Sequence, residues 1–248
     1  MTLHLRYPLL ASLGLICSIA TASGLQVSPV LLSVPSTQKA QGVWLSNNGD
    51  ALVRAQVRVY RWTQEGGEDK LTPSAGLTVS PPMLQLAVGE RQLIRAVRLG
   101  AAPSGPGAAQ EAYRIVIDEL PAAIKKGGAK DGLSFLVSYS MPVFVEPAGP
   151  AAAPPQLSWK IRTEGEKAVL EVSNSGAAYA QIGVMSFTDA AGHRTEISAG
   201  LMGYVLPGAQ MRWPLESMAK VFADGGTLQA VVNKKTTQEL IAPAHAAQ

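Results

Sequence analysis

Cysteine is almost absent from this sequence of 248 residues, with Cys17 as the single example. Cys17 lies in an apolar stretch near the N-terminus, which we expect to be removed on export. The mature chain would then contain no thiol. Such a chain can form no disulfide, no cysteine nucleophile and no cysteine-based metal site.

Histidine is scarce as well, and only His193 and His245 follow the apolar N-terminal stretch. We expect His245, in the tail PAHAAQ, to be disordered. A Ser-His-Asp triad would have to use His193, inside the turn DAAGHRT, where a histidine is usually a solvated surface residue. No HExxH motif, cysteine pair or dense aspartate loop offers metal ligands. The glycines near Gly127 do not lie between a strand and a helix, so they predict no phosphate loop. We therefore expect no enzyme, no catalytic residue, no metal and no cofactor.

Charge is also modest, at 16% of residues and a formal net charge of +3. The lysines and arginines are scattered rather than arranged in a stripe, which argues against nucleic-acid binding. Hydrophobic residues make up 47% of the chain, enough for one large or two ordinary cores. The 24 glycines and 17 prolines, with few stretches of helical period, favour an all-β fold.

Residues 1–22 have the pattern of a cleaved secretory signal peptide. A basic start precedes the apolar run PLLASLGLICSIATA, which ends in small residues, so we expect cleavage after Ala22 or Gly24. The run is short for a membrane anchor. A lipoprotein signal would use Cys17, but Ile16 before it is larger than the small residue usual at that place. The pattern is compatible with bacterial export, to the periplasm or beyond.

Period-two alternation predicts strands through most of the mature chain. One example is LVRAQVRVYRW, in which Val53, Ala55, Val57 and Val59 alternate with Arg54, Gln56, Arg58 and Tyr60. About seven such segments with turn signals between them, in residues 25–147, predict an immunoglobulin-like β-sandwich without the usual disulfide.

The Pro- and Ala-rich run at residues 148–156 predicts a fairly stiff linker between domains. Strand and turn patterns resume after it and predict a second β-domain over residues 157–242. Within that domain, SMAKVFADGG is compatible with one short helix or with a strand and turn.

The stretch DGLSFLVSYSMPVFVEP, residues 131–147, follows a glycine- and lysine-rich segment, IKKGGAKDG. Apolar side chains alternate along it at Leu133, Phe135, Val137, Tyr139 and Met141. The alternation by itself is typical of an ordinary strand that faces its own core.

The order of these segments resembles the periplasmic pilus chaperones of the chaperone–usher pathway. The resemblance covers residues 25–242. It is carried by LQVSPVLLSV, TVSPPMLQLAVGERQLIRAVR, YRIVIDELP, PVFVEP and GYVLPGAQMRW, in this order. It implies two immunoglobulin-like sandwiches set at an angle, like a boomerang. It also implies a periplasmic location and two partners, namely pilus subunits that lack their last strand and an outer-membrane usher. Neither a nucleic acid nor a small-molecule substrate is implied.

The resemblance gives the alternating stretch a function. In this family the last strand of the N-terminal domain fills the open groove of a subunit, with alternate side chains in its pockets. Leu133, Phe135, Val137 and Tyr139 are the expected donor residues. The loop at residues 124–131 would become ordered when a subunit binds.

The sequence departs from the better-known members at two positions. Pro29 and Pro142 stand where those members have the arginine and lysine that hold the subunit's C-terminal carboxylate. The double loss is similar to the archaic branch of the family. A buried carboxylate still needs a cationic partner. Arg114 is the expected replacement, unless it is an ordinary arginine on a solvated face, and Arg95 and Arg98 come next.

Weaker replacements for the anchor are three lysines of the loop, at positions 125, 126 and 130. Glu119 resembles an acidic position that helps to fix the interdomain angle in the family, but its usual arginine partner aligns with Glu146. The sequence therefore leaves the origin of the angle open. The four tryptophans, Trp44, Trp62, Trp159 and Trp213, are expected in cores or at the domain interface.

A structural or adhesive β-sandwich subunit of a surface fibre is the alternative function. Such a subunit needs a free donor extension at its N-terminus. Here the strand pattern LQVSP begins almost directly after the predicted cleavage site. This start favours the chaperone.

Overall fold

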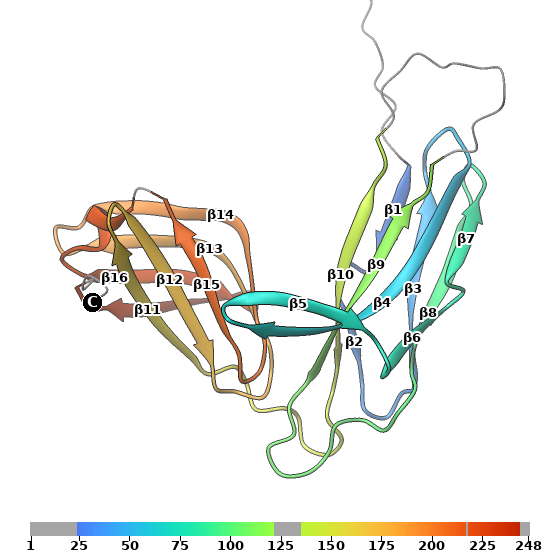
Figure 1. Cartoon of the computed structure of the whole chain (residues 1–248), viewed down its shortest axis with the longest axis horizontal. Helices are drawn as coiled ribbons and strands as arrows, with labels where there is room; N and C mark the ends of the chain where they lie inside the picture. Colours follow the sequence, from blue (N-terminus) through green and yellow to red (C-terminus); the bar gives the residue numbers. More distant parts are fainter. Residues whose placement is uncertain (1–23, 122–134, 217, 244–248) are drawn as a thin grey trace, which may run out of the picture.

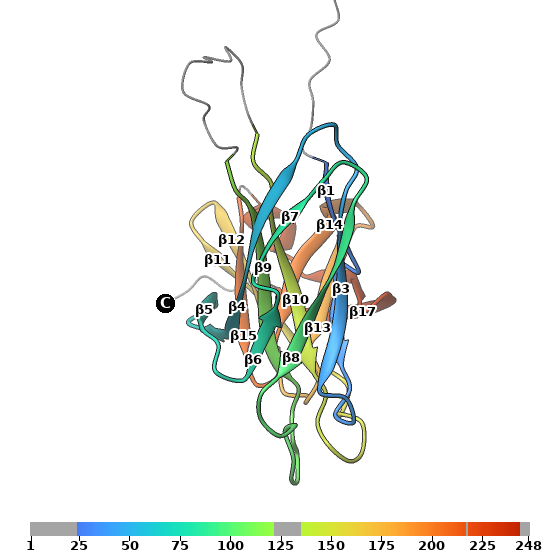
Figure 2. The ribbon, with the colours of Figure 1, turned by 90° about the vertical axis from the view of Figure 1, so that its right-hand side faces the viewer.

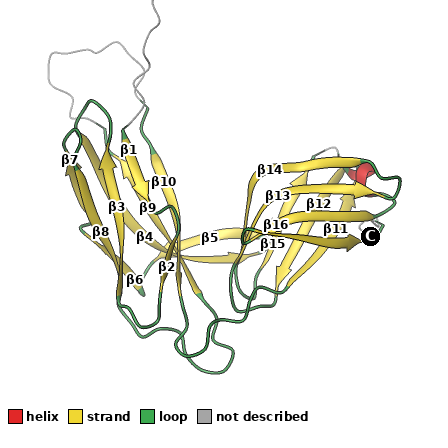
Figure 3. Cartoon of the chain, turned by 180° about the vertical axis from the view of Figure 1, so that it is seen from behind, coloured by secondary structure: helices red, strands yellow, loops and turns green. Residues whose placement is uncertain are grey.

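The computed structural model describes residues 24–121, 135–216 and 218–243, and these form two β-sandwiches arranged as the arms of a V (Figure 1). The predicted signal peptide and donor residue Leu133 lie outside the described residues. The ambiguous segment near residue 220 forms a single 3-10 turn, η1 (Ala219–Phe222), and the rest of the regular structure is strand (Figure 3). The expected all-β fold of two immunoglobulin-like sandwiches is confirmed.

The N-terminal sandwich consists of two sheets and faces the viewer in Figure 2. One sheet has the order β1 (Leu25–Ser28), β3 (Ala40–Asn47), β8 (Arg91–Arg98) and β6 (Leu77–Ser80). The other has the order β2 (Leu32–Val34), β10 (Ser138–Val145), β9 (Glu111–Glu119), β4 (Val53–Glu65) and β5 (Glu68–Pro73), with β7 (Met83–Leu86) also paired to β4.

Alternation explains which face of each strand is buried. Val53, Ala55 and Val57 of β4 lie in the core between the two sheets, as predicted, and Arg54 and Arg58 are exposed. The Pro-Pro break and the glycine turn in the middle of the domain separate β6, β7 and β8, also as predicted.

The C-terminal sandwich is also built from two sheets. One has the order β11 (Leu157–Glu164), β12 (Lys167–Asn174) and β15 (Gln210–Leu215). The other has the order β14 (Arg194–Val205), β13 (Ala180–Asp189), β16 (Gly226–Val232) and β17 (Lys235–Ile241). The 3-10 turn contributes Phe222 to the core, where its ring meets Phe187 edge-on at 4.7 Å between centroids.

A buried asparagine organises a tight turn in each sandwich. In the N-terminal sandwich the amide of Asn47 donates to the carbonyls of Ala51, Leu86 and Ala87, and its oxygen accepts from Gly49 N–H. Asn174 has the matching arrangement in the C-terminal sandwich, with bonds to Ala178 O, Val205 O and Gly176 N–H. Each side chain supplies partners to backbone groups that would otherwise be buried without any.

Aromatic side chains from both sandwiches pack together where the arms meet. Phe144 of β10 stacks on Tyr179 at 3.7 Å between centroids, with 7° between the ring planes. Trp62 of β4 meets Tyr204 of β14 edge-on at 5.4 Å. These rings form a buried junction cluster together with Ala112 and Leu206. Aromatic pairs of this kind add to the free energy gained from area burial.

Two glutamines join the sandwiches by hydrogen bonds at this junction. The amide of Gln64 donates to Tyr204 O (2.9 Å), and its oxygen accepts from Leu206 N–H (2.8 Å). Gln110 accepts from Tyr179 N–H (2.8 Å) and donates from its own backbone N–H to Ala177 O. Gln64 uses both polar atoms of its side chain, and Gln110 uses its side-chain oxygen and its backbone N–H, so the two residues fix the position of the C-terminal backbone relative to β4 and β9.

The hairpin between β4 and β5 reaches across to the C-terminal sandwich. Arg212 of β15 donates its backbone N–H to Gly67 O at 3.3 Å. Gly67 has a φ of +87°, and a Cβ there would lie 2.5 Å from the Arg212 side chain, so only glycine suits both the turn and the contact.

Glu119 does not take part in setting the interdomain angle. It lies at the end of β9 away from the junction, where its N–H donates to Val137 O. The sequence left the origin of the angle open, and in the structure the glutamines, the aromatic rings and the hairpin occupy the junction.

We predict that Gln64→Ala loosens the junction without unfolding either sandwich. The substitution removes two hydrogen bonds between the sandwiches, each worth about 0.5–1.5 kcal/mol. The Leu206 amide proton should exchange faster, because the free energy of local opening at this residue falls by about 1–3 kcal/mol. Gln41→Ala is the control, since the Gln41 amide bonds only to Gln38 within the N-terminal sandwich. Equal protection of Leu206 in both variants would contradict the assignment.

Candidate functional site

Strand β10 has a free edge over half of its length. On one side it pairs with β9 from Ser138 to Val145, whereas on the other side β2 pairs only with Val143–Val145. No other strand of the described chain lies along Ser138–Pro142. An unpaired edge of this kind is a template for another strand.

The hydrogen-bond pattern shows which backbone groups point to the free edge. Val137 O accepts from Glu119 on the β9 side, and Glu146 N–H donates to Val34 on the β2 side. In an antiparallel pair successive residues alternate between the two sides. The backbone N–H and C=O groups of Ser138 and Ser140 therefore point away from β9.

Phe135 and Val137 lie directly before β10, beyond the core. Phe135 is 65% exposed, Leu136 beside it is also exposed, and Val137 is half-buried. Phe135 and Val137 have the same parity as Met141, Val143 and Val145, whose side chains fill the core between the two sheets. The apolar face of the strand thus extends past the core that covers it.

Tyr139 marks the limit of that core. Its ring packs partly against the core cluster, and its hydroxyl donates to Leu25 O at 2.6 Å. Among the three expected donor residues that the structure describes, Tyr139 is therefore the one whose side chain is already bonded to its own domain.

An acidic residue fixes the start of β10. The Ser138 hydroxyl donates to Asp118 at 2.7 Å, and Arg58 forms an ion pair with the same carboxylate. The Ser138 hydrogen bond, followed by the Arg58 hydrogen bond, lowers the pKa of Asp118 below its ordinary value. Asp118 is therefore ionised near neutral pH and ties the first residue of β10 to β9.

Arg114 lies at the meeting point of β10 and the domain junction. It pairs with Pro142 across β9 and β10, and its guanidinium donates to Ser140 O at 3.3 Å. The guanidinium carbon lies 3.7 Å from the centre of the Trp62 ring, and the side chain is only 14% exposed. Burial lowers the pKa of Arg114 below its ordinary value. The pKa of an arginine is so high to begin with that the side chain nevertheless remains a cation. The alternative of an ordinary arginine on a solvated face does not describe this side chain.

The structure does not bring Arg95 together with Arg114. Arg95 lies on β8, in the sheet that does not contain β10, and is exposed beside Ser80 and Pro81. Arg98 is buried and donates to the carbonyls of Ser36, Gln38 and Gly100, which is a structural role. The three loop lysines lie outside the described residues.

The two prolines at the family's usual anchor positions have different surroundings. Pro29 is exposed between β1 and β2, and Pro142 is buried within β10. Pro142 belongs to the residues whose backbone faces away from β9, so its missing N–H costs no hydrogen bond to that strand.

Trp44 corrects the expectation that all tryptophans lie in cores or at the interface. It is 41% exposed on the outer face of β3, with the Arg91 guanidinium 4.5 Å from its ring centre. Trp62 lies in the junction cluster, and Trp159 and Trp213 pack against the C-terminal core, as expected.

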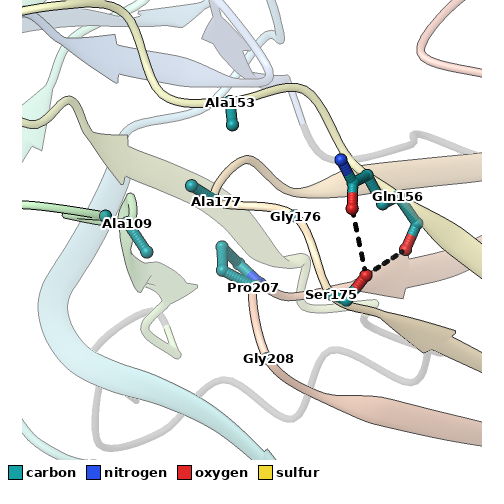
Figure 4. Close-up of a pocket in the computed structure, with 9 residues that line it drawn as sticks. Ala109, Ala153, Gln156, Ser175, Gly176, Ala177, Pro207 and Gly208 are labelled. Carbon is teal, nitrogen blue, oxygen red and sulfur yellow. Dashed lines mark hydrogen bonds between the residues drawn. The ribbon is translucent and has the colours of Figure 1, made fainter.

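A hollow of about 390 Å³ lies beside the linker at the base of the V (Figure 4). Nine residues line it: Gly107, Ala109, Ala153, Gln156, Ser175, Gly176, Ala177, Pro207 and Gly208. None of these side chains is titratable, so the hollow offers no general acid or base.

No three or more His, Cys, Asp or Glu side chains gather as a metal site within the described residues. The ring of His193 contacts Asp189 in its own turn. No helix in the described part of the chain is long and apolar enough to cross a membrane.

Comparison with known proteins agrees with this architecture. The CsuC–CsuE chaperone–tip adhesion subunit pre-assembly complex, from archaic chaperone-usher Csu pili of Acinetobacter baumannii, matches with a TM-score of 0.67 at 21% identity, over 90% of this chain and 99% of that one. The YadV chaperone matches with a TM-score of 0.63 at 16% identity, over 88% and 99%. The Salmonella enterica SafA pilin–SafB chaperone complex matches with a TM-score of 0.60 at 16% identity, over 89% and 98%.

These solved structures share the fold of this chain. A search of curated proteins found no match. The sequence model of the N-terminal domain of PapD, described as a pili and flagellar-assembly chaperone, matches residues 24–151, slightly more than half of the chain. With its two angled sandwiches and this match, the chain belongs to the PapD-like family of pilus-assembly chaperones.

Proposed function

We propose that this protein binds pilus subunits in the periplasm by donor-strand complementation and delivers them to an outer-membrane usher. The single observation that carries the proposal is the free edge of β10 at Ser138–Pro142, preceded by the exposed apolar side chain of Phe135. Backbone groups at such an edge can pair with a strand of the subunit, while alternate side chains enter its groove.

The donor residues in this proposal are Leu133, Phe135 and Val137, with Tyr139 at the end where the donor strand joins its own core. A subunit without its last strand exposes apolar core and unpaired backbone, which would otherwise aggregate. The proposed N-terminal domain, residues 25–147, supplies from one strand both the apolar side chains that cover this core and the backbone groups that pair with this backbone. Residues 148–156 then serve as the linker to the C-terminal domain, residues 157–242.

Arg114 is the proposed anchor for the subunit's terminal carboxylate. It lies beside the free edge, is mostly buried and remains charged, and a carboxylate that leaves water needs such a partner. Arg95 is on the other sheet and is not the preferred anchor. Anchoring by Arg114 in place of residues at the Pro29 and Pro142 positions places the protein, in this proposal, in the archaic branch.

The alternative of a fibre subunit receives no support from a specific observation. Such a subunit donates its N-terminal segment to a neighbour, but the described N-terminal segment, β1, is paired with β3 in its own sheet.

We predict that Phe135→Glu abolishes subunit binding while the protein still folds. A carboxylate in an apolar groove loses its hydration without gaining a partner, so recovery of a one-to-one complex should fall by about tenfold or more. The measurement is co-expression with the pilus subunit encoded beside the chaperone and purification from the periplasm. Leu136→Glu is the matched control, because the adjacent residue points to the opposite face. A Phe135→Glu protein that folds and binds normally would show that the donor assignment is wrong.

We predict that Arg114→Gln weakens subunit binding by about 10- to 100-fold, the loss expected for one charge-assisted hydrogen bond. Arg95→Gln should bind as the wild type does. Extending the subunit's C-terminus by two glycines should weaken binding to the wild type and to Arg95→Gln, with little further effect on Arg114→Gln. Equal loss in both arginine variants would contradict the anchor.

A further inference from the structure

Arg114 makes fewer hydrogen bonds than its five N–H donors allow. Its recorded hydrogen bond, to Ser140 O, is long at 3.3 Å. Two aromatic rings, from Trp62 and Tyr204, lie within cation–π distance of the guanidinium. These rings stabilise the charge without using the donors in the plane of the group.

The nearest carboxylate to this guanidinium belongs to Asp69 of β5. Its Oδ2 lies 3.9 Å from Arg114 Nη2, which is within reach of an ion pair but too far for a hydrogen bond. Attraction to Asp69 opposes the effect of burial on the pKa of Arg114. The charge of Asp69 therefore acts on Arg114 through space.

Asp69 is held at this distance by the junction between the sandwiches. Its Oδ1 accepts from the Gln64 amide at 2.8 Å, and that amide also donates to Tyr204 O. The Gln64 oxygen accepts in turn from Leu206 N–H. Asp69 would have to give up this bond in order to approach the guanidinium more closely.

We propose that Asp69 is a resident competitor for Arg114, whose carboxylate balances the guanidinium when no subunit is bound and limits how tightly Arg114 holds a subunit's terminal carboxylate. The inference rests on the proposed function and adds a regulator to the same site. A second carboxylate on one guanidinium is repelled by the first, since like charges at this separation oppose ionisation. Asp69 therefore weakens the anchor and keeps the subunit releasable.

Asp69→Asn tests this inference. The substitution removes the charge and keeps an oxygen that can accept from Gln64. It should bind the subunit about fivefold or more tightly at low salt, with a smaller gain at high salt. Glu68→Gln is the matched control, since it makes the same change of charge at the adjacent position of β5 and should bind as the wild type does.

Affinity is best measured as competition, because a subunit without its last strand is unstable alone. Wild-type and variant chaperones carrying different tags share a limited amount of the neighbouring pilus subunit, and its partition is measured at equilibrium. The same partition is measured with the subunit extended by two glycines and in an Arg114→Gln background. The gain from Asp69→Asn should disappear in both cases. Leu206 hydrogen exchange should match the wild type and so exclude a loosened junction as the cause.

The outcomes separate this inference from the proposed function. If Arg114→Gln binds like the wild type, the anchor itself fails. If Arg114→Gln is weakened but Asp69→Asn is unchanged or weaker, the anchor stands and the competitor is overturned. An equal gain in Glu68→Gln, or a gain that persists with Arg114→Gln, also overturns it, because the effect would then be one of overall charge.

Discussion

The stacking of Phe144 on Tyr179 is the contact on which the rest of the structure depends. Phe144 belongs to β10, so the strand that carries the free edge is also buried in the junction between the sandwiches. One end of β10 is therefore fixed to both domains, and the other end is open. Arg114 pairs with Pro142 between these ends, and its guanidinium lies over Trp62 and Tyr204 of the same aromatic cluster.

The fold follows from the sequence because burial and alternation are local. Val53, Ala55 and Val57 repeat with period two along β4, so all three lie on the same face of the strand. A shift of the strand by one residue would expose all of them, and the pattern therefore fixes which face is buried. The turns at Asn47 and Asn174 are local in part: each side-chain oxygen accepts from the N–H two residues on, whereas the same amides also donate to carbonyls of distant strands or turns. The alternation of residues 131–147 predicted the parity of β10, although the described strand begins at Ser138.

The junction could not be predicted in the same way. Gln64 and Gln110 join residues that are 140 and 69 positions apart, and an isolated glutamine carries no pattern. Trp44 has the large apolar side chain typical of a core residue, but it lies on the outer face of β3, where the Arg91 guanidinium packs over its ring. The proximity of Asp69 to Arg114 could not be predicted either, because it depends on how β5 packs relative to β9. Arg114 could be proposed from the sequence because its strand was expected beside the donor strand.

The continuous path of β10 also gives the proposed site a fixed length. From Phe135 to Pro142 the chain advances by seven residues. At about 3.3 Å per residue this amounts to about 23 Å of extended backbone. Because Pro142 lies opposite Arg114, the strand acts as a ruler. A subunit whose terminal carboxylate meets Arg114 and whose groove accepts Phe135 must place these features about 23 Å apart. In the proposed binding mode, geometry alone would reject subunits of other groove lengths, whatever their surface chemistry.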